Sequence, residues 1–129
     1  MHIEHVAMWS RDIERLKDFY VTYFGARAGE RYERPAQQYA SYFLVFDEGA
    51  RLELMQMPSI PASQNDPEEQ FTGLIHLALS VGTELAVDAL TERLGHDGYR
   101  VVSPPRRTGD GYYESVVFDP DDNRIEITV

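Results

Sequence analysis

Two histidines and two glutamates occupy matching positions in the two halves of the chain. His5 lies in "IEHVAMWS" and His76 in "GLIHLALSV", and both runs are otherwise largely apolar. Glu53 and Glu126 lie in the similar stretches "RLEL" and "RIEI". Imidazole nitrogens and carboxylate oxygens bind divalent transition metals, and the chain has no cysteine to contribute a thiolate. The four residues therefore predict a metal site.

Each of these residues, taken singly, has an ordinary structural interpretation. A histidine in a strand is most often a hydrogen-bonded core residue, and a glutamate between leucines usually lies on a solvated face. Repetition of both residue types at equivalent positions favours the metal site. His2 and His96 have no counterpart in the repeat, and we predict that neither is a ligand.

The repeat that carries these residues has an offset of about 71 positions. Residues 42–57 resemble residues 114–129, and each segment predicts a β-hairpin with a turn rich in Gly, Asp or Asn. A further strand is predicted near 27–33 in the first half and near 99–103 in the second. Each half is therefore β-α-β-β-β, an α+β fold made by internal duplication. The single domain 1–129 comprises module 1 at 1–57, a linker at 58–72 and module 2 at 73–129.

A predicted helix follows each histidine-bearing strand. Apolar residues at helical spacing place the first helix from near Ser10, a suitable N-cap, to just before Gly25. The same pattern places the second helix from near Thr83 to just before Gly95.

Side chains of a strand alternate between its two faces, which decides where the candidate ligands point. His5 shares its face with Trp9, and each histidine is followed two residues later by an alanine that leaves room beside it. The alternate positions are more continuously apolar and are expected to face the helices. If a pseudo-twofold axis relates the halves, His5, Glu53, His76 and Glu126 converge on one point.

Composition limits the classes of partner. The chain has 129 residues, 43% hydrophobic residues and a net charge of −10, and Arg106–Arg107 is the only local concentration of basic residues. Such a surface repels nucleic acid and anionic membranes. No apolar stretch approaches the ~18 residues of a membrane span. Because "MHIEH" is too polar for a signal peptide, we expect a cytoplasmic protein.

The whole chain resembles the vicinal oxygen chelate superfamily. This superfamily includes glyoxalase I, fosfomycin-resistance thiol transferases, methylmalonyl-CoA epimerase, extradiol dioxygenases and bleomycin-binding proteins. The resemblance rests on "IEHVAMWSRDIERLKDFYVTYFGA", "FDEGARLELM", "GLIHLALSV" and, most specifically, "GDGYYESVVFDPDDNRIEITV". It implies paired βαβββ modules that form a cup-shaped mixed sheet around a divalent metal.

The resemblance also implies a reaction. A ligand set of His5, Glu53, His76 and Glu126 is similar to that of glyoxalase I, which favours a lyase or isomerase acting on a small carbonyl compound through a metal-stabilised enediolate. Glu126 is the better candidate for the catalytic base, with Glu53 as its counterpart. Zinc, nickel, manganese and iron(II) all suit such a site, and the sequence does not choose among them.

Substrate recognition departs from that family pattern. Glyoxalase I enzymes of this size tend to have an arginine and an asparagine, which anchor glutathione, where this chain has Trp9 and Met57. We therefore expect glutathione adducts to be poor substrates. Trp9, Met55, Met57, Arg106 and Tyr113 are the predicted substrate contacts.

Two further expectations concern function and assembly. The alternative to an enzyme is a binding or resistance protein of the same fold that holds a drug or metabolite without turnover. Relatives of this length commonly dimerise, with each metal site either closed within one chain or built from both, and we predict a homodimer. Aromatic residues in excess of one small core are candidates for the contact: Tyr20, Tyr23, Phe24, Tyr42 and Phe43.

Overall fold

A computed structural model describes all residues from 1 to 129. The chain divides into two compact units, Met1–Gln64 and Asn65–Val129, and each has its own sheet, helix and core. The boundary between the units falls inside the predicted linker 58–72. Neither helix has the length and apolar character needed to cross a membrane.

Each unit contains one α-helix and a set of strands in the predicted order. The first unit comprises β1 (His5–Trp9), α1 (Ile13–Phe24), β2 (Arg27–Ala28), β3 (Tyr32–Arg34), the 3₁₀ helix η1 (Pro35–Gln37), β4 (Tyr39–Val45) and β5 (Arg51–Gln56). The second comprises β6 (His76–Ser80), α2 (Glu84–His96), β7 (Val101–Arg107), β8 (Tyr113–Phe118) and β9 (Arg124–Thr128).

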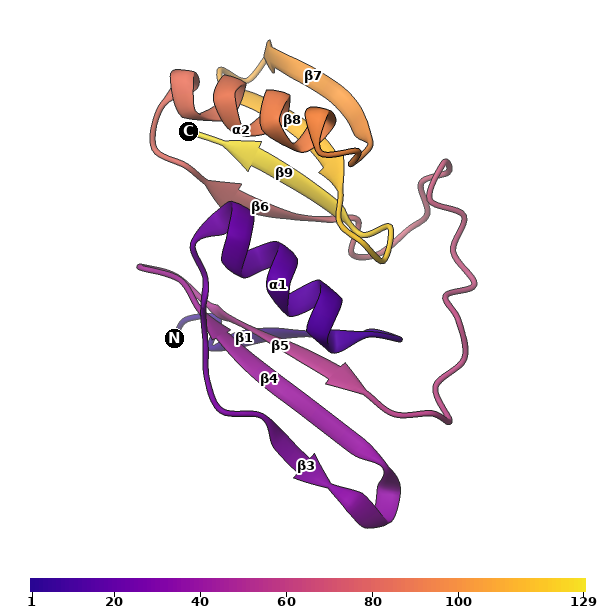
Figure 1. Cartoon of the computed structure of the whole chain (residues 1–129). Helices are drawn as coiled ribbons and strands as arrows, with labels where there is room; N and C mark the ends of the chain where they lie inside the picture. The colour runs from indigo at the N-terminus through magenta and orange to yellow at the C-terminus, as the bar shows by residue number, and fades with distance from the viewer. The chain divides into compact units, whose positions relative to one another are not determined.

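The two sheets are mixed, open and built alike (Figure 1). The first has the order β1-β5-β4-β2, with β3 paired to β4, and the second has the order β6-β9-β8-β7. β1 pairs in parallel with β5, and β6 pairs in parallel with β9. Ala7 lies opposite Glu53 and Ala78 lies opposite Glu126, so the repeat extends to the strand register. The predicted fold of two βαβββ modules is confirmed.

In the first unit, α1 covers one face of β4 and β5 and buries its apolar stripe there. Leu52 and Leu54 point from β5 into this core, whereas Glu53 points to the opposite face. Tyr20, a candidate for the subunit contact, is fully buried in this core and is therefore not at a surface. The helix contributes Ile13, Leu16, Phe19 and Tyr20.

The second unit repeats the arrangement with α2 packed on β7, β8 and β9. Ile125 and Ile127 of β9 are fully buried on the helix side of the sheet. Thr91 of α2 and Ser115 of β8 are also buried, and their hydroxyl oxygens lie 2.6 Å apart. The Thr91 hydroxyl is also 2.6 Å from the Val87 carbonyl oxygen, so this polar pair is satisfied inside the core.

The start of α1 differs from the prediction. Asp12, not Ser10, is the N-cap, and its carboxylate accepts a hydrogen bond from the Arg15 N–H at 3.0 Å. The Ser10 N–H instead donates to the Met55 carbonyl oxygen at 2.8 Å. This bond extends the pairing of β1 with β5, so the helix begins later. The predicted end before Gly25 is confirmed, because Gly25 adopts the left-handed conformation with φ 65°.

For α2 the start is confirmed and the end is wrong. The Thr83 hydroxyl caps the helix by accepting from the Ala86 N–H. The helix runs through Gly95 to His96, and the left-handed residue after it is Gly98, with φ 92°. A Cβ added at Gly95 would lie 3.4 Å from the Val101 side chain, an ordinary contact distance, so Gly95 lies where α2 packs on β7.

The hairpins are confirmed, but the strands that precede them are shifted. The strand predicted near 27–33 is two short strands, β2 and β3, which pair with different parts of β4. The strand predicted near 99–103 runs instead from Val101 to Arg107. It contains Pro104 and Pro105, which an edge strand with register shifts tolerates because their missing N–H groups are not needed by a neighbour.

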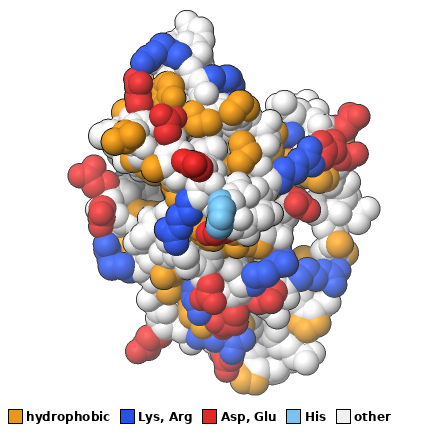
Figure 2. Space-filling model, turned by 45° about the horizontal axis from the view of Figure 1, so that its top comes forward, with side chains coloured by type: hydrophobic (Ala, Val, Ile, Leu, Met, Phe, Trp, Pro, Cys, Tyr) orange, Lys and Arg blue, Asp and Glu red, His pale blue; other side chains and the backbone are white.

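Charged side chains are mixed over the surface. Figure 2 shows acidic, basic and hydrophobic side chains interspersed across the face in view. Several arginines pair with a carboxylate of their own unit, as Arg27 does with Asp47 at 2.7 Å. Arg107, half of the only basic dipeptide, pairs with Glu84. Positive charge is thus locally compensated, in keeping with the net charge of −10.

Candidate functional site

In the first unit, His5 and Glu53 face each other across the β1–β5 pair. The His5 Nε2 atom lies 3.8 Å from the Glu53 Oε2 atom. The His5 side chain is 41% exposed and that of Glu53 is 16% exposed, so the carboxylate is recessed and the imidazole is accessible. Ala7, which lies directly opposite Glu53 in the register, leaves the space beside the pair open.

The second unit reproduces this pair. The His76 Nε2 atom lies 3.6 Å from the Glu126 Oε2 atom, with side-chain exposures of 43% and 15%. Ala78 again lies directly opposite the glutamate. Two segments far apart in the sequence therefore build the same imidazole–carboxylate geometry from the same parallel strand pairing.

The spacing of each pair suits two ligands of one cation. Two donors that are each about 2.1 Å from a metal lie roughly 3–4 Å apart unless they are opposite one another, and 3.8 Å and 3.6 Å fall in that range. Neither unit gathers three His, Asp or Glu side chains into a group that could hold a metal ion on its own. Each unit thus supplies two of the four predicted ligands.

Glu4, a residue that sequence analysis overlooked, orients His5. Its carboxylate contacts His5 Nδ1 and also accepts from the Arg51 guanidinium. These two contacts hold the pKa of Glu4 below its ordinary value, the His5 contact being the larger cause. A carboxylate at Nδ1 favours the tautomer whose Nε2 carries a free lone pair. Nε2 is the atom that faces Glu53.

Glu126 has a second carboxylate beside it, that of Glu114 on β8. Burial raises the pKa of the Glu126 carboxyl, the negative charge of Glu114 raises that pKa further, and His76 opposes both effects. Glu114 is itself only 11% exposed and pairs with Arg106 at 3.3 Å. The Arg106 guanidinium also donates to the Ser103 hydroxyl at 2.7 Å, which fixes its position.

The predicted substrate contacts are divided between the two units. Trp9 lies on the His5 face of β1 with 40% exposure, and Met55 lies beside it on β5 in the same register row. Met57 follows the end of β5 and is half-buried. Arg106 belongs to the Glu114–Glu126 cluster of the second unit.

Tyr113 lies on the opposite face of the second sheet from Glu114 and Glu126. Its hydroxyl donates to the Asp88 carboxylate of α2 at 2.7 Å, so its side chain is on the helix side of the second sheet. The two remaining histidines are also outside the pairs. His2 is exposed before β1, and the His96 side chain is 88% exposed at the end of α2, beside Asp97.

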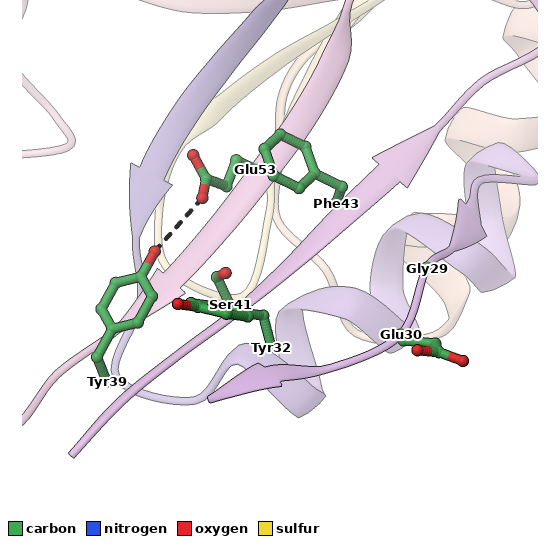
Figure 3. Close-up of a pocket in the computed structure, with 7 residues that line it drawn as sticks. All are labelled: Gly29, Glu30, Tyr32, Tyr39, Ser41, Phe43 and Glu53. Atoms are coloured by element: carbon green, nitrogen blue, oxygen red, sulfur yellow. Dashed lines mark hydrogen bonds between the residues drawn. The ribbon is translucent and has the colours of Figure 1, made fainter. Parts of the chain in front are cut away.

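A pocket of about 450 Å³ in the first unit adds residues that sequence analysis missed (Figure 3). Seven residues line it: Gly29, Glu30, Tyr32, Tyr39, Ser41, Phe43 and Glu53. The Tyr39 hydroxyl donates to Glu53 Oε1 at 3.3 Å, so the pocket adjoins the His5–Glu53 pair. Strand alternation carries the missing signal, because Tyr39, Ser41 and Phe43 share one face of β4 and Phe43 pairs with Glu53.

Sequence comparison agrees with this architecture. Residues 2–127 match the family described as the Glyoxalase/Bleomycin resistance protein/Dioxygenase superfamily. The uncharacterized protein YwkD of Bacillus subtilis (strain 168) is 30% identical over 127 residues, which cover 97% of this chain and 94% of YwkD. The uncharacterized protein YqjT of the same organism is 41% identical over 58 residues, 43% of this chain and only 45% of YqjT.

Solved structures share the same fold. Glyoxalase I from Zea mays superimposes with a TM-score of 0.80 at 21% sequence identity. The match covers 98% of this chain and 44% of the maize chain, so this chain spans less than half of that protein. At this level of identity the likeness concerns the arrangement of helices and strands.

Proposed function

Because the chain belongs to the glyoxalase/bleomycin resistance protein/dioxygenase superfamily, we propose that it is a metal-dependent, glyoxalase-like lyase or isomerase. Its substrate is a small carbonyl compound. The observation that carries the proposal is the repeated pair, His5 with Glu53 and His76 with Glu126, at 3.8 Å and 3.6 Å. A structural histidine would not need a carboxylate at the same distance in both units.

The proposed site holds one divalent cation with all four residues. Two neutral imidazoles and two carboxylates balance the charge of such an ion, and the mixed nitrogen and oxygen donors suit zinc, nickel, manganese or iron(II). The contact of Glu4 with His5 supports the assignment, because metal-binding histidines commonly donate their second N–H to a carboxylate.

Within this proposal, Glu126 is the residue that moves the proton. When bound, the cation supplies Lewis-acid polarisation of the substrate carbonyl. Glu126 accepts the proton from the carbon next to that carbonyl and returns it to the neighbouring carbon. A placed base of this kind contributes about 10²–10⁴ in rate.

Glutathione adducts are not the proposed substrates. Trp9 is 40% exposed on the His5 face, where the family pattern would place a basic anchor for a carboxylate. Met57 likewise offers no polar anchor. A substrate with less charge than a tripeptide fits these residues better.

The second candidate is a binding protein without turnover, favoured by the pocket beside Glu53. A cavity of about 450 Å³ lined by three aromatic rings is of a size to hold a small molecule. This candidate differs from the enzyme in one measurable respect, namely that the bound carbonyl compound is released unchanged.

Elemental analysis followed by a substrate screen tests the proposal. The protein is reconstituted with zinc, nickel, manganese or iron(II) and passed through a desalting column. We expect His76→Ala to lose most of the bound metal and His96→Ala, a variant at an exposed site, to keep it. The loaded protein is then offered α-oxoaldehyde thiol adducts, epimerisable thioesters and catechols. A depleted His96→Ala with a fully loaded His76→Ala would overturn the metal assignment, and metal binding without turnover would favour the binding protein.

A further inference from the structure

The pocket of the first unit is built by alternate residues of β4 and by their neighbours on the paired strands β3 and β5. Tyr39, Ser41 and Phe43 point from one face of β4, and the register places Tyr32 opposite Ser41 and Glu53 opposite Phe43. The small, buried Ser41 lies between the larger side chains and leaves the space that the rings surround. Figure 3 shows Tyr39 and Phe43 on either side of Ser41, with Glu53 facing the Tyr39 hydroxyl.

The walls of this pocket are aromatic and arranged edge to face. The Tyr32 and Tyr39 ring centroids are 6.3 Å apart at 69°, and those of Trp9 and Tyr39 are 6.1 Å apart at 86°. Phe43 packs edge-on against the His5 ring with centroids 5.5 Å apart. Rings at these angles present both edges and faces, which a further flat aromatic ring contacts favourably.

The charge of the pocket selects against anions. Its seven lining residues include the carboxylates of Glu30 and Glu53 and no Lys or Arg. Arg51 stacks on the ring of Phe43, one of the lining residues, at 4.2 Å. The Arg51 guanidinium is already paired with the carboxylate of Glu4. In the metal-free protein, an anionic ligand would therefore meet two negative charges without a free counter-charge.

We propose that this pocket binds the uncharged aromatic group of the substrate and makes the protein selective for neutral aryl carbonyl compounds. The ring is held between Tyr32, Tyr39 and Phe43, and the substituent on the ring lies toward Glu53. The chemical step rests on the proposed function, whereas the aromatic selectivity rests on the pocket alone. The two are therefore tested separately.

The test measures ligand binding by the metal-free protein. Trp9 is the only tryptophan and packs against Tyr39, so its fluorescence reports on the pocket. The probes are benzyl alcohol, which is neutral and aromatic, cyclohexylmethanol, which is neutral and not aromatic, and benzoate, which is anionic. We expect benzyl alcohol to bind about tenfold more tightly than either of the others.

Two variants locate the binding. Tyr32 is 57% exposed and lines the pocket, whereas Tyr112 of the second unit is equally exposed and is not among the lining residues. Tyr32→Ser should weaken the binding of benzyl alcohol about fivefold or more, whereas Tyr112→Ser should leave the affinity for benzyl alcohol unchanged. Circular dichroism of both variants checks that they fold as the parent does.

Any of three results would overturn the inference. Two are cyclohexylmethanol or benzoate binding as tightly as benzyl alcohol, and the third is Tyr32→Ser and Tyr112→Ser behaving alike. The proposed function fails in a different way: the protein binds benzyl alcohol selectively but takes up no metal. Metal uptake without aromatic selectivity would overturn the pocket assignment alone.

Discussion

His5 and His76 hold equivalent positions but have different neighbours before them in the chain. Glu4 contacts His5 Nδ1, whereas the residue before His76 is Ile75, which has no side-chain acceptor. Removing the carboxylate should loosen the orientation of His5 and leave Arg51 without its partner near the site. We expect Glu4→Ala to weaken zinc affinity by about tenfold to a hundredfold, measured by competition with a chelator.

The matched control is Glu48→Ala, which removes a carboxylate from the exposed turn before β5. This variant should bind zinc as the parent does. Equal affinities of the Glu4 and Glu48 variants would contradict the orienting role of Glu4.

The raised pKa of Glu126 predicts how the metal-free protein responds to pH. The folded state holds the Glu126 proton more tightly than the unfolded chain, so this group lowers stability as pH rises from the ordinary carboxyl value of 4.5 through its folded pKa. Glu126→Gln removes that penalty. At pH 7, without metal, we expect its Tm to exceed that of the parent by a few degrees, and we expect the difference to vanish near pH 4.

With zinc present, we expect the parent to have the higher Tm. Zinc binding stabilises the folded parent, and the variant lacks the Glu126 carboxylate that binds the ion. Glu92→Gln, an exposed position on α2, serves as the control and should show no pH-dependent difference in Tm. A Glu126→Gln variant that is less stable than the parent at pH 7 without metal would contradict the burial argument.

At the level of elements, the start of α1 offers two residues that could serve as its N-cap. Ser10 and Asp12 can both cap a helix, and the structure selects Asp12 because Ser10 completes the pairing of β1 with β5. Asp12→Ala should lower the free energy of unfolding by about 1 kcal/mol. Denaturation in urea would measure this loss, with the exposed helix position Asp18→Ala as control. Equal stability of the two variants would refute the assignment of the cap.

Most of the fold can be predicted from the sequence, because the duplication provides two similar segments from which each element is predicted. Hydrophobic periodicity and turn residues recur in both halves. They predict the hairpins, the two helices and the faces of the histidine strands. The misplaced boundaries lie where tertiary contacts override local signals. α2 continues past Gly95 where it packs on β7, and the left-handed residue comes only at Gly98. β7 continues through two prolines because it is an edge strand.

Sequence alone singles out only those residues of the candidate site that occur at equivalent positions in both halves. The two histidine–glutamate pairs stand out because both halves keep them. Glu4 and Glu114 have no such signal, since each occurs in one half alone and acquires its role from a neighbour. Tyr113 is a residue that sequence predicts as a substrate contact. It is next to Glu114 in the chain, but its side chain lies on the helix side of the sheet.

At the level of the whole molecule, the histidine strands raise the question of assembly. β1 and β6 each form an edge of their own sheet, and the equivalent residues Ile3 and Leu74 beside them are 70% and 82% exposed. Exposed edges with apolar residues tend to be covered. We expect a homodimer, so light scattering at micromolar concentration should give twice the chain mass of 14.8 kDa. A mass of one chain at all accessible concentrations would exclude it.

Mixing two inactive variants distinguishes the possible arrangements of such a dimer. His5→Ala and His76→Ala chains are unfolded together and refolded as a mixture. If the metal site takes one pair from each chain, mixed dimers regain one intact site and bind metal. If each site is closed within one chain, the mixture binds no more metal than either variant does alone.

Counting the metal ions bound per chain shows whether the two histidine–glutamate pairs bind one cation together. The parent, His5→Ala and His76→Ala are titrated with zinc in a calorimeter, and the bound metal is then measured by elemental analysis. We expect one ion per chain in the parent and, in either variant, loss of most of the binding, because each pair contributes half of the ligands. Two ions per parent chain, with each variant losing one of them, would show that each pair binds its own cation and would refute the shared site.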